Sequence, residues 1–155
     1  MDTSVVLRNP LFSGFTPEEI QGFSSIITDK NIAAGMAVFI EGMPGESLYL
    51  IEKGTIRISK MLAEGEEKTL VVLGVDDFFG EMAILDGAPR SATARVIEDA
   101  KLLLIRKNDF ESLCDGDPKI GLKFLRNIIK VFTGRVRDSN DALRDILLWT
   151  EKNVK

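Results

Sequence analysis

The sequence predicts a mainly β fold, a double-stranded β-helix (jelly-roll barrel), with helices before it and a long helix after it. Between residues 30 and 106, short apolar segments are separated by glycine turns, which is typical of a barrel or jelly roll rather than a parallel sheet. On either side, apolar residues recur at helical spacing. A chain of 155 residues is long enough for one domain with its own core. We therefore expect a single domain over 1–155, with N-terminal helices in 1–29, a β-roll in 30–106 and C-terminal helices in 107–150.

Residues 4–27 are predicted to be helical. Thr16 is a suitable N-cap, Pro17 fits the first helical turn, and Glu19 lies three residues after Thr16, as in a capping box. The apolar face that follows consists of Ile20, Phe23, Ile26 and Ile27.

Short strands are predicted in the middle region, six to eight in number. Residues 52–54 are expected to form a turn, and residues 63–67 a polar hairpin loop. Residues 70–73 form a continuous apolar run, which indicates a buried strand. The clearest strand patterns lie at residues 38–40, 48–51, 56–61, 70–73, 94–96 and 102–106.

Helical spacing returns after residue 106. Residues 107–114 predict one short helix, and a second begins with Asp117 as N-cap and Pro118 at the first helical position. The second helix extends to about Thr150, a length of about 50 Å at 1.5 Å per residue. Gly134 weakens it by about 1 kcal/mol relative to alanine, and we expect a bend there.

Composition excludes several classes of function. The net charge of −4 argues against a general nucleic-acid-binding surface, which needs a basic face. The absence of histidine and the single cysteine remove most zinc sites and histidine-based catalysis, so we expect no catalytic residues and no metal. No apolar run approaches the ~20 residues of a membrane span, and there is no signal-peptide pattern. Cys114 lies in an apolar pattern and is expected to be a buried small hydrophobe, in keeping with a cytoplasmic protein.

Residues 78–94 carry the pattern that is most informative about function. Gly80 stands between a strand end and a short apolar helix, where it permits a positive φ and close approach of a ligand. The first N–H groups of that helix have no partner within the helix and can meet an anion. Glu81 and Arg90 lie nine positions apart around these groups. The arrangement predicts a site for a small anion that also carries a hydroxyl group.

The side chains suggest which anion fits. Arg90 offers a planar fork for two phosphate oxygens, and one arginine matches a monoanionic diester. Glu81 only accepts hydrogen bonds, so it needs a donor such as a sugar hydroxyl. Ser91 could reach the phosphate or the edge of a base. The alternative is an exposed hairpin with a surface ion pair worth about 0–1 kcal/mol, but the spacing, the glycine, the short helix and the strand entry at residues 89–93 occur together and favour a ligand site.

Residues 79–85 (Phe-Gly-Glu-Met-Ala-Ile-Leu) and 89–93 (Pro-Arg-Ser-Ala-Thr) resemble the phosphate-binding cassette of the cyclic nucleotide-binding domain family. This family includes bacterial cAMP receptor proteins, regulatory subunits of cAMP-dependent protein kinase and gating domains of ion channels. Residues 41–54 are similar to the first hairpins and glycine turns of the family. The resemblance covers about residues 10–135, most of the chain.

The resemblance implies a role for each cassette residue. Arg90 would hold the cyclic phosphate together with Ser91, Glu81 would accept the ribose 2′-hydroxyl, and Gly80 would admit the sugar. The long helix would fold over the base as a lid. Further contacts would come from the backbone of Met82 and Ala83 and from apolar walls at Val71, Leu73 and Ile84.

Two departures from the family affect the expected partners. DNA-binding relatives continue past the long helix into a helix-turn-helix module, whereas this sequence stops at Lys155, so we expect no DNA binding by this chain. The bacterial activators place a Thr-Ser pair against the purine, and an ungapped reading puts Arg135 and Val136 there. Arg135 could contact the purine or face solvent. Ser91 permits cGMP, but bacterial cAMP receptors also carry serine there, and we favour cAMP over cGMP.

The distal part of the long helix predicts a protein partner. Leu125, Ile128 and Phe132 are expected to pack on the barrel. An apolar group beyond its reach, Leu143, Ile146, Leu147 and Trp149, usually finds a partner. We favour a homodimer through this helix over docking on another protein or packing back on the same chain.

These features together favour a sensor rather than an enzyme. Nucleotide binding would shift the arrangement of the C-terminal helices, and the helices would transmit ligand occupancy. The alternative is a structural or protein-interaction module of the same fold that binds no nucleotide. A cupin-like metalloenzyme is a third alternative, which the lack of histidine disfavours.

Overall fold

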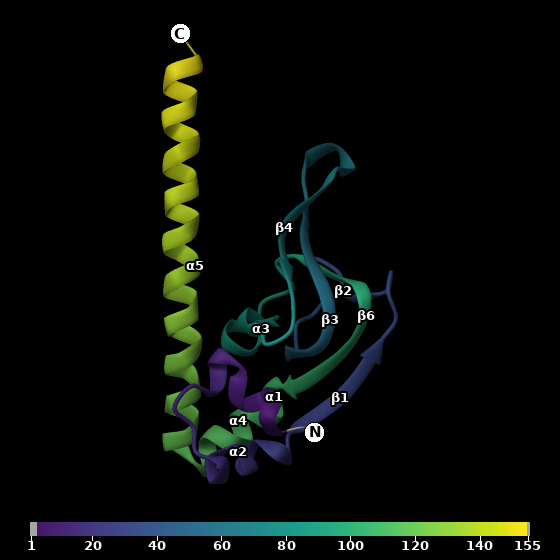
Figure 1. The fold of residues 1–155 in the computed structure, drawn as a ribbon, viewed down its shortest axis with the longest axis vertical. Coiled ribbons are helices and arrows are strands. Elements are labelled where there is room, and N and C mark those ends of the chain that lie inside the picture. Colours follow the sequence, from purple (N-terminus) through teal and green to yellow (C-terminus); the bar gives the residue numbers. More distant parts are fainter. Residues whose placement is uncertain (1–2, 155) are drawn as a thin grey trace.

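A computed structural model describes residues 3–154 of the chain. Its strands form one antiparallel, six-stranded sheet with the path β1-β6-β3-β4, in which β2 also pairs with β6 and β5 with β3. Helices flank this sheet, and the longest stands to one side of it (Figure 1). The strands are β1 (Ile27–Ile32), β2 (Ala37–Phe39), β3 (Ser47–Met61), β4 (Glu67–Leu73), β5 (Phe78–Phe79) and β6 (Thr93–Arg106). The prediction of a β region that is not a parallel sheet, between N-terminal helices and a long C-terminal helix, is confirmed.

The two central strands are longer than expected. β3 has 15 residues and β6 has 14, whereas the sequence predicted two short strands in place of each. The predicted turn at residues 52–54 is wrong, because these residues lie inside β3, where the pairing with β6 shifts register several times. Gly54 has a φ of 95°, and a Cβ there would lie 2.7 Å from the Ala100 Cα and from the Asp99 carbonyl oxygen. The glycine thus lets β3 continue past β6 through an irregular stretch instead of turning back.

Strand β4 is not the buried strand that its apolar run predicted. Leu70, Val71 and Val72 are 59%, 45% and 52% exposed, while Leu73 is buried. β4 pairs with β3 at the edge of the sheet, so its side chains lack a neighbouring strand on the other side. The apolar run at residues 70–73 therefore belongs to an edge strand beside a cavity and not to a strand of the core.

Three short helices make up the N-terminal segment: α1 (Thr3–Arg8), the 3-10 helix η1 (Pro10–Phe12) and α2 (Pro17–Ser24). The capping box is confirmed: the Thr16 hydroxyl accepts from the Glu19 N–H at 3.2 Å, and the Thr16 N–H donates to Glu19 Oε2 at 2.8 Å. Ile27, expected on the helix face, is instead the first residue of β1, where it pairs with Ile105. The helix ends earlier than predicted because the chain turns at Ser25 to enter the sheet.

The remaining helices are η2 (Ala63–Gly65), α3 (Glu81–Asp86), α4 (Lys107–Gly116) and α5 (Pro118–Asn153). The predicted start of α5 is confirmed, since the Asp117 carboxylate accepts from the N–H groups of Lys119 and Ile120. The bend expected at Gly134 is wrong, because α5 runs unbroken through it (Figure 1). A single glycine costs about 1 kcal/mol, which the hydrogen bonds of the adjoining turns outweigh. With 36 residues in α5 alone, the helical share is larger than a mainly β class suggests.

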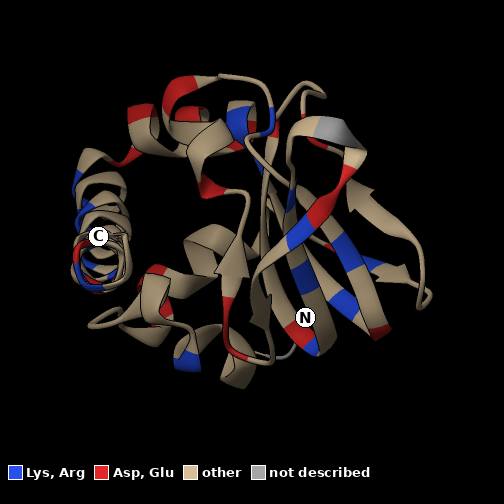
Figure 2. Ribbon diagram, turned by 90° about the horizontal axis from the view of Figure 1, so that it is seen from above, with Lys and Arg blue, Asp and Glu red and all other residues tan. Residues whose placement is uncertain are grey.

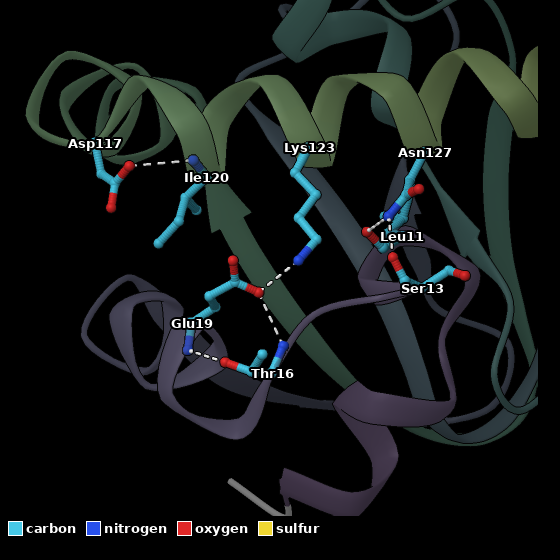
Figure 3. Close-up of polar contacts among 8 residues, drawn as sticks. All are labelled: Leu11, Ser13, Thr16, Glu19, Asp117, Ile120, Lys123 and Asn127. Carbon is cyan, nitrogen blue, oxygen red and sulfur yellow. Dashed lines mark hydrogen bonds and ion pairs between the residues drawn. The ribbon is translucent and has the colours of Figure 1, made fainter.

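The first half of α5 is fixed to the N-terminal helices. The Phe124 ring is fully buried and lies 5.4, 5.1 and 5.1 Å from the rings of Phe12, Phe23 and Phe110. Two polar side chains reinforce this contact: Lys123 pairs with Glu19 at 2.6 Å, and Asn127 donates to the carbonyl oxygens of Leu11 and Ser13 (Figure 3).

The second half of α5 contains no buried residue. Every residue from Val136 to Val154 is exposed, and the helix extends well past the sheet (Figure 1). Seen along its axis, α5 stands beside the sheet, and segments coloured for positive and negative residues are interspersed over strands and helices (Figure 2). Cys114 packs against the core but is half-buried rather than buried as expected, and desolvation raises the pKa of its thiol. None of the described helices combines the length and apolar character that a membrane crossing requires.

Replacing Phe124 by alanine should therefore remove the anchor of α5. We expect Phe124→Ala to lower the free energy of unfolding by about 3–5 kcal/mol, since a fully buried ring leaves a cavity. Leu148→Ala, in the exposed half of the same helix, should stay within about 0.5 kcal/mol of the parent. Urea unfolding followed by circular dichroism measures both, and equal losses would contradict the division of α5 into two halves.

Candidate functional site

A cavity of about 540 Å³ lies between α3, the loop after it, strand β4 and the middle of α5. This volume falls within the range of small-molecule sites in proteins. The cavity is lined by Phe39, Ile58, Leu70, Val71, Leu73, Phe79, Gly80, Glu81, Met82, Ala83, Pro89, Arg90, Ser91, Ala92, Arg135, Asp138, Ser139 and Ala142.

Gly80 connects the sheet to α3 at the floor of the cavity. The preceding residues form β5 on β3, and Gly80 then adopts φ 77° and ψ 10° as the N-cap of α3. A Cβ at this position would lie 2.8 Å from Arg90 Nη1 and 3.0 Å from the Ser47 carbonyl oxygen. Both the backbone angle and the crowding require glycine here, as its place in the sequence predicted.

Arg90 is a buried cation without an anionic partner. It is 7% exposed, and its Nη1 and Nη2 donate to the carbonyl oxygens of Gly80 at 3.1 Å and Ser47 at 2.9 Å. Its Cζ lies 4.0 Å from the centre of the Phe39 ring. Among residues 3–154, no carboxylate forms an ion pair with Arg90, and its buried Nε has no hydrogen-bond partner.

Burial lowers the pKa of Arg90, which remains charged at neutral pH. Two of the five N–H donors of the guanidinium are used by carbonyl oxygens, and the buried Nε has no partner. A buried charge is costly unless it is paired, and an anion in the cavity would pair it. Arg90 lies in the loop three residues before β6 rather than at the start of a strand, as the sequence had suggested.

Glu81 is the second charged group at the cavity floor, and it joins α3 to α5. Its side chain is 8% exposed, and Oε1 accepts from Arg135 Nη1 at 2.9 Å. Arg135 also donates from Nη2 to the Phe78 carbonyl oxygen at 3.3 Å, with its Cζ 4.9 Å from the Phe78 ring. Within the described part of the chain, Glu81 Oε2 makes no hydrogen bond and is free to accept one.

The upper walls of the cavity come from β4, the loop after α3, and α5. Val71 and Leu73 supply apolar surface, and the Ser91 hydroxyl lies 3.6 Å from Met82 Sδ. On α5, Asp138 and Ser139 follow Arg135 by three and four residues, so the same helix face presents a carboxylate and a hydroxyl above the cavity floor.

The structure brings together nine of the ten residues that the sequence pointed to: Val71, Leu73, Gly80, Glu81, Met82, Ala83, Arg90, Ser91 and Arg135. The tenth, Ile84, is 4% exposed and belongs to the core cluster between sheet and helices, so it does not line the cavity. Its side chain packs instead against core residues that include Phe78 and Leu103.

Several lining residues were not expected from the sequence. Asp138, Ser139 and Ala142 could have been found from their spacing to Arg135, which places all four on one helix face. Phe39 could not be found in this way. The face of the sheet on which its ring lies depends on the irregular pairing of β2 with β6, which the sequence does not reveal. Residues 3–154 contain no group of three or more His, Cys, Asp or Glu side chains placed to hold a metal ion.

Comparison with known proteins adds independent findings. A family model described as "Cyclic nucleotide-binding domain" matches residues 29–117. The cyclic AMP receptor protein of Thermus thermophilus is 33% identical over 143 residues, which cover 92% of this chain and 64% of that protein. The cAMP-dependent protein kinase regulatory subunit of Hypocrea atroviridis is 38% identical over 104 residues, 67% of this chain and 21% of that protein.

A solved structure shares the fold. The crystal structure of the Thermus thermophilus catabolite activator protein aligns with a TM-score of 0.81 and 33% identity, over 92% of this chain and 65% of that chain. The chain thus spans less than two thirds of the length of these relatives.

Gly80→Ala tests the close packing at the cavity floor. A left-handed conformation alone costs an alanine about 1–2 kcal/mol. We expect Gly80→Ala to lower the free energy of unfolding by more than this amount, because the new methyl group also displaces Arg90. Gly35→Ala is a matched control with a φ of 86° and open space around its Cβ position, so it reports the conformational cost alone. Equal losses in chemical unfolding would mean that Arg90 is not held by this packing.

Proposed function

This chain belongs to the cyclic nucleotide-binding domain family, and we propose that it binds a cyclic nucleotide, cAMP in preference to cGMP, as a sensor. The observation that carries the proposal is the buried Arg90 guanidinium without an anion. A cyclic phosphate carries a single negative charge, which one buried arginine can match without further cations. The six-stranded sheet would be the jelly-roll barrel of this family around that site.

The proposed pose puts the phosphate against Arg90, with Ser91 and the backbone N–H groups of Met82 and Ala83 beside it. The ribose then lies over Gly80, which has no side chain to exclude it, and the 2′-hydroxyl donates to Glu81 Oε2. Arg135 on Oε1 offsets the repulsion between Glu81 and the phosphate. The ligand would therefore complete a chain of alternating charges in the order Arg90, phosphate, Glu81 and Arg135.

The base would extend between β4 and α5. Adenine offers its amino group as a donor, and Asp138 and Ser139 of α5 both present acceptors on the lining of the cavity. Val71 and Leu73 would cover a face of the ring. The preference for cAMP is also supported by the names of the two curated relatives, which both refer to cAMP.

Nucleotide binding would be transmitted to the rest of the assembly by a change in the placement of α5. Its first half is fixed by Phe124, Lys123 and Asn127, its second half is exposed, and Arg135 lies at the boundary in contact with the Glu81 carboxylate. A ligand that binds one placement of Arg135 better than another shifts the helix toward that placement. We propose a regulatory role without catalysis, and no DNA binding by these residues.

The output would be a homodimer through α5. Apolar side chains repeat every seven residues at Leu122, Ile129, Val136 and Leu143, and all four are 51–62% exposed. A second series, three residues later in each heptad, begins with Leu125 and Phe132 and includes Ile146, with Ser139 as its polar member. This a/d pattern is typical of a coiled coil between two helices.

Arg90→Gln tests the proposed function. Losing two charge-assisted hydrogen bonds, together about 3 kcal/mol, should weaken nucleotide binding about 100-fold. Isothermal titration calorimetry with cAMP and, separately, cGMP measures this and the preference between them. Arg95→Gln, an arginine on β6 that does not line the cavity, should bind like the parent. No binding of either nucleotide by ligand-free parent protein would instead favour a nucleotide-independent interaction module.

Arg135→Ala tests the link between ligand and α5. Without Arg135, Glu81 is an unpaired buried carboxylate next to the phosphate, and we expect nucleotide affinity to fall about tenfold. Amide exchange of residues 135–142 should then no longer slow when cAMP binds. Arg144→Ala, which removes an exposed arginine farther along the same helix, should leave both measurements unchanged. Ligand-dependent protection that survives in Arg135→Ala would refute this route.

A further inference from the structure

Lys60, near the end of β3, joins the β3–β4 hairpin to the loop that carries Arg90 and Ser91. Its Nζ donates to the Ser91 carbonyl oxygen at 2.8 Å and to Glu41 Oε1 at 2.9 Å. The side chains of Lys60 and Glu41 are 46% and 28% exposed. Neither residue lines the cavity, and the function proposed above gives neither of them a role.

The backbone pairing between β3 and β6 ends next to Lys60. Ser59 and Thr93 are the last paired residues, and the chain before Thr93 runs outside the sheet as the loop of residues 87–92. Lys60 follows Ser59 directly, and its ammonium group donates to this loop just beyond the last pair. The side chain therefore continues the link between β3 and the loop where the backbone pairing has stopped.

The backbone of Arg90 is held from both sides, whereas that of Ser91 is not. The Arg90 N–H donates to the Met43 carbonyl oxygen, and the Arg90 carbonyl accepts from the Gly42 N–H. Among residues 3–154, no backbone N–H donates to the Ser91 carbonyl oxygen, which accepts from the Lys60 side chain instead. The orientation of the Ser91 peptide, and with it the direction in which the Ser91 side chain starts, thus depends on Lys60.

Glu41 holds the Lys60 ammonium group in place. Its Oε1 accepts from Lys60 and its Oε2 accepts from the Met61 N–H at 3.0 Å, while its own N–H donates to Thr93 Oγ1 at 3.0 Å. The hydrogen bond from Met61, together with that from Lys60, keeps the pKa of Glu41 below its ordinary value, so the carboxylate is charged at neutral pH. An ammonium group fixed on one side by a charged carboxylate has a defined position for the Ser91 carbonyl on the other.

We propose that Lys60, held by Glu41, is a positioning residue for the phosphate of the nucleotide and acts through Ser91. The inference rests on the proposed function, in which Ser91 lies beside the cyclic phosphate. Lys60 fixes the Ser91 peptide, and the Ser91 hydroxyl then meets the ligand without a search for its orientation. Lys60 is outside the lining of the cavity, so this role needs no contact between Lys60 and the ligand.

The same stretch of β3 also supports the wall that the base would meet. Ile58, two residues before Lys60, lines the cavity and pairs with Val71 of β4, which lines it too. Lys60 therefore sets where Ser91 stands relative to this apolar wall. A nucleotide whose base lies on the wall and whose phosphate lies at Ser91 meets both groups at a spacing that is fixed before it binds.

Calorimetric titration of the full chain with cAMP tests the proposal. We expect Lys60→Met, which keeps the side chain long and removes its charge, to weaken cAMP binding about five- to tenfold. Lys60→Arg should bind within about twofold of the parent, because a guanidinium has enough donors for both Glu41 and the Ser91 carbonyl. Lys68→Met is the matched control: Lys68 lies on the same hairpin, pairs with the exposed Glu66 and does not line the cavity, so this variant should bind like the parent.

A double-mutant cycle with Ser91→Ala distinguishes a positioning role from general structural support. If Lys60 acts through Ser91, Lys60→Met should weaken cAMP binding by less than about twofold once the hydroxyl is absent. Urea unfolding of Lys60→Met should match that of the parent, because the side chain is half exposed.

The outcomes separate this role from the proposed function. Parent-like binding of cAMP by Lys60→Met, or an undiminished effect of Lys60→Met in the Ser91→Ala background, would overturn the positioning role and leave the proposed function intact. Failure of Lys60→Arg to restore binding, together with easier unfolding of Lys60→Met, would reduce Lys60 to structural support. A parent protein that binds neither cAMP nor cGMP would overturn both the positioning role and the proposed function.

Discussion

The site depends on the cost of keeping the Arg90 guanidinium out of water. The ring of Phe39 and the carbonyl oxygens of Gly80 and Ser47 offset part of this cost, but they supply no negative charge. The backbone fixes the same residue on both sides: its N–H donates to the Met43 carbonyl oxygen and its own carbonyl accepts from the Gly42 N–H, each at 2.8 Å. The cation is therefore held in place before a ligand arrives, and an anion that binds there meets a group that need not reorganise.

The features that the sequence predicted well are those that local chemistry determines. The capping box at Thr16, the start of α5 at Asp117 and the left-handed Gly80 each depend on residues within a few positions. Glu81 and Arg90 both line one cavity, because only a short helix and a loop separate them. Glu81 and Arg90 are close in the sequence, so their spacing along the chain was a good guide to their distance in space.

Predictions failed where long-range packing decides the outcome. The apolar run at residues 70–73 lies on an edge strand, and Gly54 continues a strand instead of ending it, because both depend on what β3 pairs with. Ile84 lies on the core side of α3. Arg135 reaches Glu81 across 54 positions of sequence, which only the placement of α5 beside α3 determines. Arg135 was expected to contact a base or to face solvent, and the structure pairs it with Glu81, while Ser139, one turn later, also lines the cavity.

The position of Arg135 along α5 explains how a small ligand could act on a long helix. Upstream of it, Phe124 and Asn127 fix the helix to the N-terminal segment, and downstream no residue of α5 is buried. A ligand-dependent contact well inside the fixed half could not move the helix, because core packing opposes the movement. A contact far into the exposed half would move only the end of the helix, because the rest of the protein does not touch that end. At the boundary, a change at Glu81 meets little resistance from the core and still acts on the whole exposed half. The same boundary lies beside Leu85, so α3 can bias the helix from the side as well as through its carboxylate. The rigid hold on Arg90 by its backbone partners and a helix that is held only up to Arg135 are therefore complementary requirements of the proposed sensor.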